Sequence, residues 1–313
     1  MPASRLRRRQ LRVAWGFLAP ALLGVAVFFI YPLIMTVYYS FTTFNLFNPP
    51  KWNHFANWVF LFTKDPLIGK ATVNTLWFVA IMVPIRIIGA LFVAWMLTTA
   101  KRAQGILRTI YYLPALIPPV ASTIAFVFVL NPASGPVNAV LRRLFGHAPG
   151  WFTNPSLSKP SLTFLGLWVL GDIMVIFLAA LLDVPTELYE AAEIDGAGGW
   201  RRFWNITLPT IQPVLLFSAV TGVINGLQYF TEPAVASATA QGKSNVGGGA
   251  SANLGWPSNS TLTFGQELYQ RAFGSGSLFG YASAMAVVMF AVTLVVMFFL
   301  LRRFADFNPE VAS

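Results

Sequence analysis

The fold of this chain is decided by its long apolar stretches, and the clearest of them is residues 71–99, with the sequence ATVNTLWFVAIMVPIRIIGALFVAWMLTT. Arg86 is the one charged residue in this stretch. A helix of about 20 apolar residues is long enough to cross a hydrocarbon core about 30 Å thick. The stretch therefore predicts a transmembrane helix.

Five further stretches are of the same kind and have charged residues near their borders. They are residues 15–38, the segment from Arg108 to Asn131-Pro132, and residues 161–182, 210–233 and 278–301. The whole chain is 56% hydrophobic and only 10% charged, whereas soluble domains are about 25% charged. We therefore expect an all-α membrane protein with six transmembrane helices and a membrane domain at residues 13–304.

The basic residues indicate how these spans are oriented. With a cytoplasmic N-terminus, twelve Lys and Arg residues lie in short inside segments and eight in longer outside segments. Short cytoplasmic loops carry the excess of basic residues in membrane proteins. We therefore expect both termini in the cytoplasm, with a basic segment at residues 1–12 and a tail at residues 305–313. The same rule explains the net charge of +10 without a nucleic-acid partner.

The first forty residues have an alternative interpretation, a cleaved signal peptide. Five arginines precede an apolar run, as in such peptides. The run is too long for a signal-peptide core, however, and no A-x-A cleavage site follows it. The prediction is an uncleaved first span.

The residue inventory argues against several kinds of chemistry. There is no cysteine, and the two histidines, His54 and His147, lie in separate loops, so no metal site is expected. Gly242-Lys243-Ser244 is similar to the end of a phosphate-binding loop, but Ser237 stands where that loop needs its first glycine. No cluster of nucleophile, base or metal ligands at a membrane surface supports a membrane enzyme. We therefore expect neither a catalytic residue nor a cofactor.

One polar segment, between the fourth and fifth spans, differs from the other loops. It begins with Pro185-Thr186-Glu187, and an acid in the first turn favours a helix start. Alanine and glutamate continue the helix to Asp195, and Gly196 permits the left-handed turn that ends it. Pro209 and Pro213 fix the start of the next span. A helix this short is not stable alone in water. We therefore expect a soluble partner to bind it.

The same segment resembles the loop signature of binding-protein-dependent ABC importer permeases, E-A-A-x-x-x-G, nine residues, then I-x-L-P. The signature occurs here as Glu190-Ala191-Ala192, Gly196, Ile206 and Leu208-Pro209, with every spacing kept. The variant Asp195-Gly196-Ala197 is similar to the sugar-transporter branch of that family, which includes the maltose and glycerol-phosphate importer permeases.

Weaker similarities to this branch extend over about residues 11–304. Asn74-Thr75 opens the second span, Tyr112-Leu113-Pro114 the third and Gly280–Ala284 the sixth. The chain departs from the branch after the fifth span, where Thr231-Glu232-Pro233 stands in place of T-x-G-G-P.

The resemblance implies a permease of a type I ABC importer in a bacterial or archaeal cytoplasmic membrane. The working unit would contain this chain, a second permease, two ATPase subunits and an extracytoplasmic solute-binding protein. The segment at Glu190–Gly196 would be the coupling helix, which sits in a cleft of the ATPase, within a coupling loop at residues 184–209. Glu190 would contact the ATPase. The cargo would be a sugar, with a di- or oligosaccharide favoured over a polyol or sugar phosphate.

The fifth span carries a polar stripe. Its members are Ser218, Thr221, Asn225, Gln228, Tyr229 and Glu232, which share one face of a continuous helix. Polar groups that face lipid are costly, so this face should meet protein or a water-filled pathway. Amides, hydroxyls and an aromatic ring suit a neutral sugar. The alternative is a polar contact with a second permease.

Two further charges, Arg86 and Asp172, fall near the middle of their spans. An unpaired charge at that depth costs several kcal/mol. We expect a buried structural ion pair; otherwise each side chain faces the cavity.

The loop at residues 234–277, expected outside the membrane, contains Gly247-Gly248-Gly249 and many Ser and Asn residues, which predict a flexible excursion without a core of its own. Two functional alternatives stay open. One is a permease of the same type for a non-sugar solute. The other is a stand-alone transporter driven by an ion gradient, which usually has more spans, internal repeats and membrane carboxylates.

Overall fold

A computed structural model describes residues 3–100, 103–242, 253–274 and 276–305. Within these ranges the chain is helical, with one isolated antiparallel bridge between Thr42 and Trp52 and no strand. The helical elements are α1 (Ala3–Val25), η1 (Ala26–Ile30), α2 (Tyr31–Tyr39), α3 (Ala56–Thr63), α4 (Ile68–Trp77), η2 (Phe78–Met82), α5 (Val83–Thr99), α6 (Gln104–Tyr112), η3 (Leu113–Leu116), α7 (Pro119–Val129), α8 (Pro136–Phe145), α9 (Pro155–Trp168), α10 (Gly171–Leu182), α11 (Thr186–Ile194), α12 (Gly199–Arg202), η4 (Phe203–Thr207), α13 (Leu208–Thr210), α14 (Gln212–Leu227), α15 (Thr231–Ala240), α16 (Phe264–Phe273) and α17 (Phe279–Ala305).

Among the described residues, three helices are long and apolar enough to cross a membrane alone: Val13–Tyr39, Ile68–Thr99 and Phe279–Arg302. Three further pairs of helices meet the same requirement together but are sharply bent. The bends are 97° between Gln104–Leu116 and Pro119–Val129, 47° between Pro155–Trp168 and Gly171–Leu182, and 68° between Gly199–Thr210 and Gln212–Leu227. The six predicted spans are thus three long helices and three bent pairs.

The chain forms two compact units. One contains the residues up to Asp65 together with Arg271–Phe290, and the other contains Pro66–Gln270 together with the residues from Ala291 onward. In the first unit, the buried carboxylate of Asp65 accepts hydrogen bonds from the hydroxyl of Tyr281 at 2.6 Å and from Nη2 of Arg271 at 3.1 Å. The N–H of Gly280 donates to the carbonyl of Phe44 at 2.8 Å. These bonds fix the start of α17.

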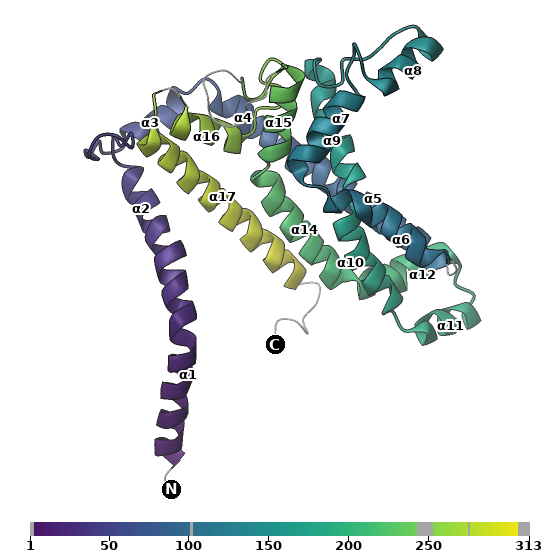
Figure 1. Cartoon of the computed structure of the whole chain (residues 1–313). Coiled ribbons are helices and arrows are strands. Elements are labelled where there is room, and N and C mark those ends of the chain that lie inside the picture. The colour runs from purple at the N-terminus through teal and green to yellow at the C-terminus, as the bar shows by residue number, and fades with distance from the viewer. Residues whose placement is uncertain (1–2, 101–102, 243–252, 275, 306–313) are drawn as a thin grey trace. The chain divides into compact units, whose positions relative to one another are not determined.

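The core of the second unit lies along α5 and α10, which pack side by side (Figure 1). Ala90 and Ala94 are fully buried one turn apart on α5, and small residues at that spacing let two helix backbones approach closely. Met174 and Phe177 of α10 fill the space against them. At Gly171, where α10 begins, a Cβ atom would clash with the backbone of Tyr111 and Tyr112.

The fifth span does not continue as one helix to Glu232, contrary to the prediction. α14 ends at Leu227, and a new helix, α15, starts at Thr231 and contains Glu232 and Pro233 in its first turn. Pro233 has no N–H to donate to the preceding turn, so it cannot continue α14, but it fits the first turn of a new helix. The predicted stripe is therefore divided between two helices and the residues that join them.

The prediction of a flexible excursion is wrong for the described parts of residues 234–277, which are packed but share their buried cluster with Ala71 outside the loop. These parts contain most of α15 and all of α16, and Ala234, Leu254 and Leu262 are buried in one cluster with Ala71. The side chain of Asn74 donates to the carbonyls of Asn259 and Leu262, each at 2.9 Å. Residues 243–252, which include the predicted glycine run and Lys243, lie outside the described residues, as do residues 306–313 of the predicted tail.

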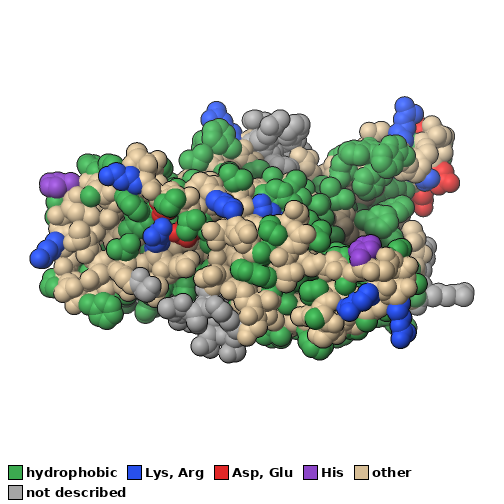
Figure 2. Space-filling view, turned by 90° about the horizontal axis from the view of Figure 1, so that it is seen from above, with side chains coloured by type: hydrophobic (Ala, Val, Ile, Leu, Met, Phe, Trp, Pro, Cys, Tyr) green, Lys and Arg blue, Asp and Glu red, His purple; other side chains and the backbone are tan. Residues whose placement is uncertain are grey.

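Hydrophobic side chains cover much of the surface. Figure 2 shows them widely spread on the side seen from above, among scattered Lys and Arg side chains. In α1–α2 the side chains of Phe17 and Phe28 are 83% and 74% exposed. Such exposure is expected of helices that face lipid or another membrane subunit rather than water.

Candidate functional site

The segment that carries the sequence signature forms a short helix outside the helix bundle of its unit (Figure 1). α11 covers Thr186–Ile194, as predicted, and none of its residues is buried. Glu190 and Ala191 are exposed, and Ile194 is 88% exposed. A helix with no buried face is stabilised little by its own chain, which fits an element that a partner covers.

The end of α11 has the geometry that a glycine permits. Gly196 has a φ of +72°, the left-handed conformation expected from the sequence. Its N–H donates to the carbonyl of Glu193 at 3.0 Å, and the N–H of Ala197 donates to that of Ala192 at 2.8 Å. These two bonds form a Schellman motif, which satisfies the last carbonyls of the helix.

Two side-chain contacts connect α11 to the segment that follows it. The hydroxyl of Tyr189 shares a hydrogen bond of 2.8 Å with that of Thr207, and Nη1 of Arg202 lies 3.3 Å from a carboxylate oxygen of Glu193. Tyr189 and Ile206 also pack against the core cluster of α5 and α10. Tyr189 was not singled out from the sequence; its position beside Glu190 was the only signal. The rest of the signature lies nearby: Asp195 caps α11, and Leu208 and Pro209 begin α13.

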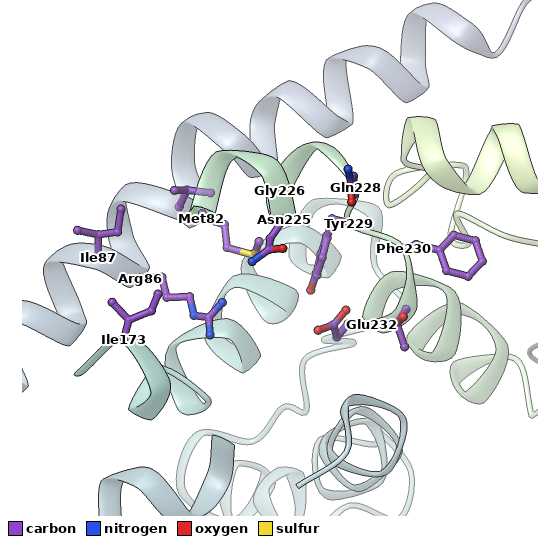
Figure 3. Close-up of a pocket in the computed structure, with 13 residues that line it drawn as sticks. Met82, Arg86, Ile87, Ile173, Asn225, Gly226, Gln228, Tyr229, Phe230 and Glu232 are labelled. Atoms are coloured by element: carbon purple, nitrogen blue, oxygen red, sulfur yellow. The ribbon is translucent and has the colours of Figure 1, made fainter. Parts of the chain in front are cut away.

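A second candidate site is a cavity of about 250 Å³ in the same unit. Its polar lining comes from Arg86 of α5, Asn225 of α14 and Glu232 of α15, with Gln228 and Tyr229 from the connection between α14 and α15. Figure 3 shows Arg86, Asn225, Tyr229 and Glu232 pointing into one space, whereas the ring of Phe230 points away. An adjoining cavity of about 200 Å³ shares Met82, Arg86, Tyr229 and Glu232 and adds Ser122 and Asp172.

Several polar groups of this cavity are available to a ligand. Within the described ranges, the amide of Asn225 and the hydroxyl of Tyr229 make no hydrogen bond to another side chain or to the backbone. The ring of Tyr229 is held against Phe78, with centroids 5.0 Å apart. The cavity is smaller than complete small-molecule sites of roughly 300–1,000 Å³.

Arg86 and Asp172 are in contact. Nη2 of Arg86 lies 2.9 Å from both carboxylate oxygens of Asp172 and 3.3 Å from the carbonyl oxygen of Val169. The Asp172 side chain is 54% exposed, so the pair is not fully buried. Arg86 also lines both cavities and Asp172 one of them, so pairing and facing the cavity occur together.

Two predicted stripe residues lie away from the cavity. The hydroxyl of Thr221 donates to the carbonyl of Phe217 in its own helix at 2.8 Å. Ser218 is buried, and its Oγ has no hydrogen-bond partner among the described residues. Met82 and Ser122 also line the cavities, but they were not predicted from the sequence. Met82 lies one helical turn before Arg86, on the same face, which was the available signal. In the described part of the chain no group of three His, Cys, Asp or Glu could hold a metal ion.

Bent apolar helices around a polar cavity, with an exposed helix on a loop between two spans, are an arrangement that suits a membrane transport subunit. The comparison with known families agrees: residues 86–306 match the model of the binding-protein-dependent transport system inner membrane component. The chain belongs to this family. It is a permease subunit of an ABC importer, a non-catalytic inner-membrane component that works with an ATPase, a second permease and a solute-binding protein. A stand-alone transporter driven by an ion gradient is therefore not favoured.

Individual relatives are similar over nearly their whole length. The chain is 34% identical to the lactose transport system permease protein LacF of Rhizobium radiobacter, over 91% of each chain. It is 31% identical to the sulfoquinovosyl glycerol transport system permease protein SmoG of Agrobacterium fabrum, over 89% of this chain and 86% of SmoG. A chain of a bacterial ABC transporter that imports the acidic polysaccharide alginate has the same fold, with a TM-score of 0.80, 22% identity and coverage of 97% and 99%.

Proposed function

We propose that the cavity around Asn225, Tyr229 and Glu232 forms half of the translocation pathway for a sugar. The observation that carries this proposal is that hydrogen-bonding groups from separate elements point into one space (Figure 3). Polar groups inside a membrane protein that have no structural partner mark a substrate pathway more often than a packing contact. A sugar offers many hydroxyls for such groups and an apolar face for the aromatic ring.

The relatives support a sugar as the cargo. The names of the similar permeases mention lactose and sulfoquinovosyl glycerol, both of which contain a glycosidic linkage. The proposed cargo is accordingly a di- or oligosaccharide, received from the solute-binding protein. A permease of the same type for a non-sugar solute is the alternative, and it would need no such set of hydroxyl-binding groups.

Uptake measurements test the pathway. A ligand screen on the partner binding protein identifies the sugar, and its uptake is then followed in proteoliposomes that contain the complete importer. Asn225→Ala and Tyr229→Phe are each expected to lower uptake about three- to tenfold, the effect of losing a hydrogen bond or two. Unchanged uptake in both variants, with normal assembly, would show that the cavity is not the pathway.

We further propose that α11 is the coupling helix and lies in the cytoplasm, where the ATPase binds it. Its exposure supports this, as does the predicted orientation, with the loop at residues 184–209 and both termini inside. The chain has no cysteine, so Glu190→Cys gives a single thiol. A membrane-impermeant maleimide is expected to label it in inside-out vesicles, and the ATPase is expected to protect it. Labelling from the outside would contradict the orientation, and labelling unaffected by the ATPase would contradict the docking.

A further inference from the structure

We infer that Glu232 makes this permease select neutral sugars against acidic ones. The inference rests on the proposed function, because it assigns the class of sugar that the cavity accepts. The chemistry to be distinguished is the presence or absence of an anionic group on otherwise similar sugars. Relatives of both kinds are similar to this chain, so family membership does not decide between them.

The charges of the two adjoining cavities do not cancel. They are lined by one cation, Arg86, and two acids, Asp172 and Glu232. Arg86 forms an ion pair with Asp172, with Nη2 2.9 Å from both carboxylate oxygens, so these two opposite charges counter each other. Among the residues that the structure describes, no Lys or Arg forms an ion pair with Glu232. The lining therefore has one acidic side chain in excess.

The position of Glu232 directs its carboxylate at the ligand. It lies in the first turn of α15, immediately after the connection that carries Tyr229, and is only partly exposed. Figure 3 shows its oxygens turned toward the space between Asn225 and Arg86. A ligand held by Asn225 and Tyr229 would therefore lie next to this carboxylate.

Neutral and acidic sugars interact very differently with a carboxylate such as that of Glu232. Sugar hydroxyls donate hydrogen bonds to a carboxylate, and charge-assisted hydrogen bonds are the stronger kind. A uronate or sulfonate group has only acceptors to offer and carries a second negative charge. Two like charges about 6 Å apart, at an effective dielectric constant of about 20, repel enough to weaken binding on the order of a hundredfold. Arg86 reduces this repulsion, but Asp172 counters its charge, so the net charge of the lining stays negative.

The experiment measures binding to the complete importer in nanodiscs by saturation-transfer NMR, without the binding protein. The probes are lactose, maltotriose and raffinose, each paired with its C6-carboxylate (uronate) derivative. We expect the wild-type importer to bind at least one neutral probe at least tenfold more tightly than its acidic partner. Glu232→Gln keeps the shape and hydrogen bonding of the side chain but removes the charge. It is expected to reduce this ratio about tenfold or more.

Two control variants isolate the charge at this position. Asp183→Asn makes the equivalent change at an exposed carboxylate at the end of α10 and should leave the ratio unchanged. Glu232→Asp keeps the charge and should preserve most of the selectivity. It remains a usable test if the Glu232→Gln importer assembles poorly. Equal wild-type affinities for a pair of probes, or an unchanged ratio in a well-assembled Glu232→Gln, would overturn the selectivity and leave the sugar pathway standing. A wild-type importer that binds none of the probes would contradict the proposed function itself.

Discussion

The proposed coupling segment and the cavity are built in opposite ways. The coupling segment consists of neighbouring residues, from Thr186 to Pro209, and its shape comes from short-range contacts such as the Gly196 turn and the bond between Tyr189 and Thr207. The cavity is assembled from residues as far apart in the sequence as Met82 and Glu232. The segment at residues 186–209 can be recognised from the sequence alone, whereas the cavity forms only when the chain folds.

The difference also concerns exposure. α11 has no buried residue, so we expect changes at its exposed side chains to act mainly through the proposed partner subunit. The cavity lies among packed helices, so changes there act on the ligand and on the fold at once. Substitutions that separate these two kinds of effect therefore test the assignment of each region.

The largest expected effect is at the turn that ends α11, the proposed coupling helix. Gly196→Val places a β-branched residue at a φ of +72°, which costs about 2 kcal/mol or more. That penalty is enough to displace the Schellman turn in most molecules, since 1.4 kcal/mol is a factor of ten. We expect ATP-driven uptake to fall at least tenfold, while the ATPase subunits retain their own basal hydrolysis.

Gly198→Val is the matched control. At both glycines, no atom beyond the glycine and its chain neighbours lies within 4 Å of the place where a Cβ would be, so added bulk meets no clash at either site. Gly198 has a φ of −68° and a ψ of 163°, which valine adopts readily. Similar losses of uptake in both variants would mean that the turn at Gly196 is not what matters.

The next largest effect is expected where charges face each other at the cavity. Arg86→Asp and Asp172→Arg each place like charges where the structure has an ion pair of 2.9 Å. Because Asp172 is half exposed, we expect the free energy of unfolding of the complex to fall by about 1–2 kcal/mol in thermal unfolding experiments. Uptake should fall several-fold. The charge-swapped double variant should recover much of both.

The pair between Arg202 and Glu193 gives the comparison in the coupling segment. Its atoms are 3.3 Å apart and Glu193 is 74% exposed, so the same exchange should change stability by less than about 0.5 kcal/mol. A double variant at Arg86 and Asp172 that restores nothing would show that the observed contact is not the role of these charges.

Sequence patterns predicted contiguous features well. The apolar runs predicted the membrane spans, and Gly196 predicted the end of α11. Both features depend on short segments, because hydrophobicity and a left-handed backbone are local properties. The break between α14 and α15 was missed although Pro233 lies just after it, because the polar residues keep a helical spacing through the break. The packed parts of residues 234–277 were missed because their burial depends on partners such as Asn74, far away in the sequence.

A smaller effect is expected from the contact that holds α11 to the following segment. Tyr189→Phe removes a hydrogen bond of 2.8 Å to Thr207, and such a bond contributes about 0.5–1.5 kcal/mol. Amide hydrogen exchange in α11 should accelerate about two- to tenfold, with a modest loss of uptake. Tyr31→Phe, at a side chain that is 57% exposed on α2, should change neither. Unaltered exchange in Tyr189→Phe would mean that packing against the core, not the hydroxyl, positions the helix.

The smallest effect distinguishes a helical stripe from an assembled cavity. If the polar residues of the fifth span lined the pathway as one helix face, Thr221 would contribute to sugar uptake as Asn225 does. In the structure the Thr221 hydroxyl is bonded to its own helix and does not line the cavity, so Thr221→Val keeps the shape and removes only that local bond. Sugar uptake should stay at the wild-type level in Thr221→Val and fall in Asn225→Ala. Equal losses in the two variants would restore the continuous stripe and place the pathway along α14, away from Glu232 and the selectivity inferred from it.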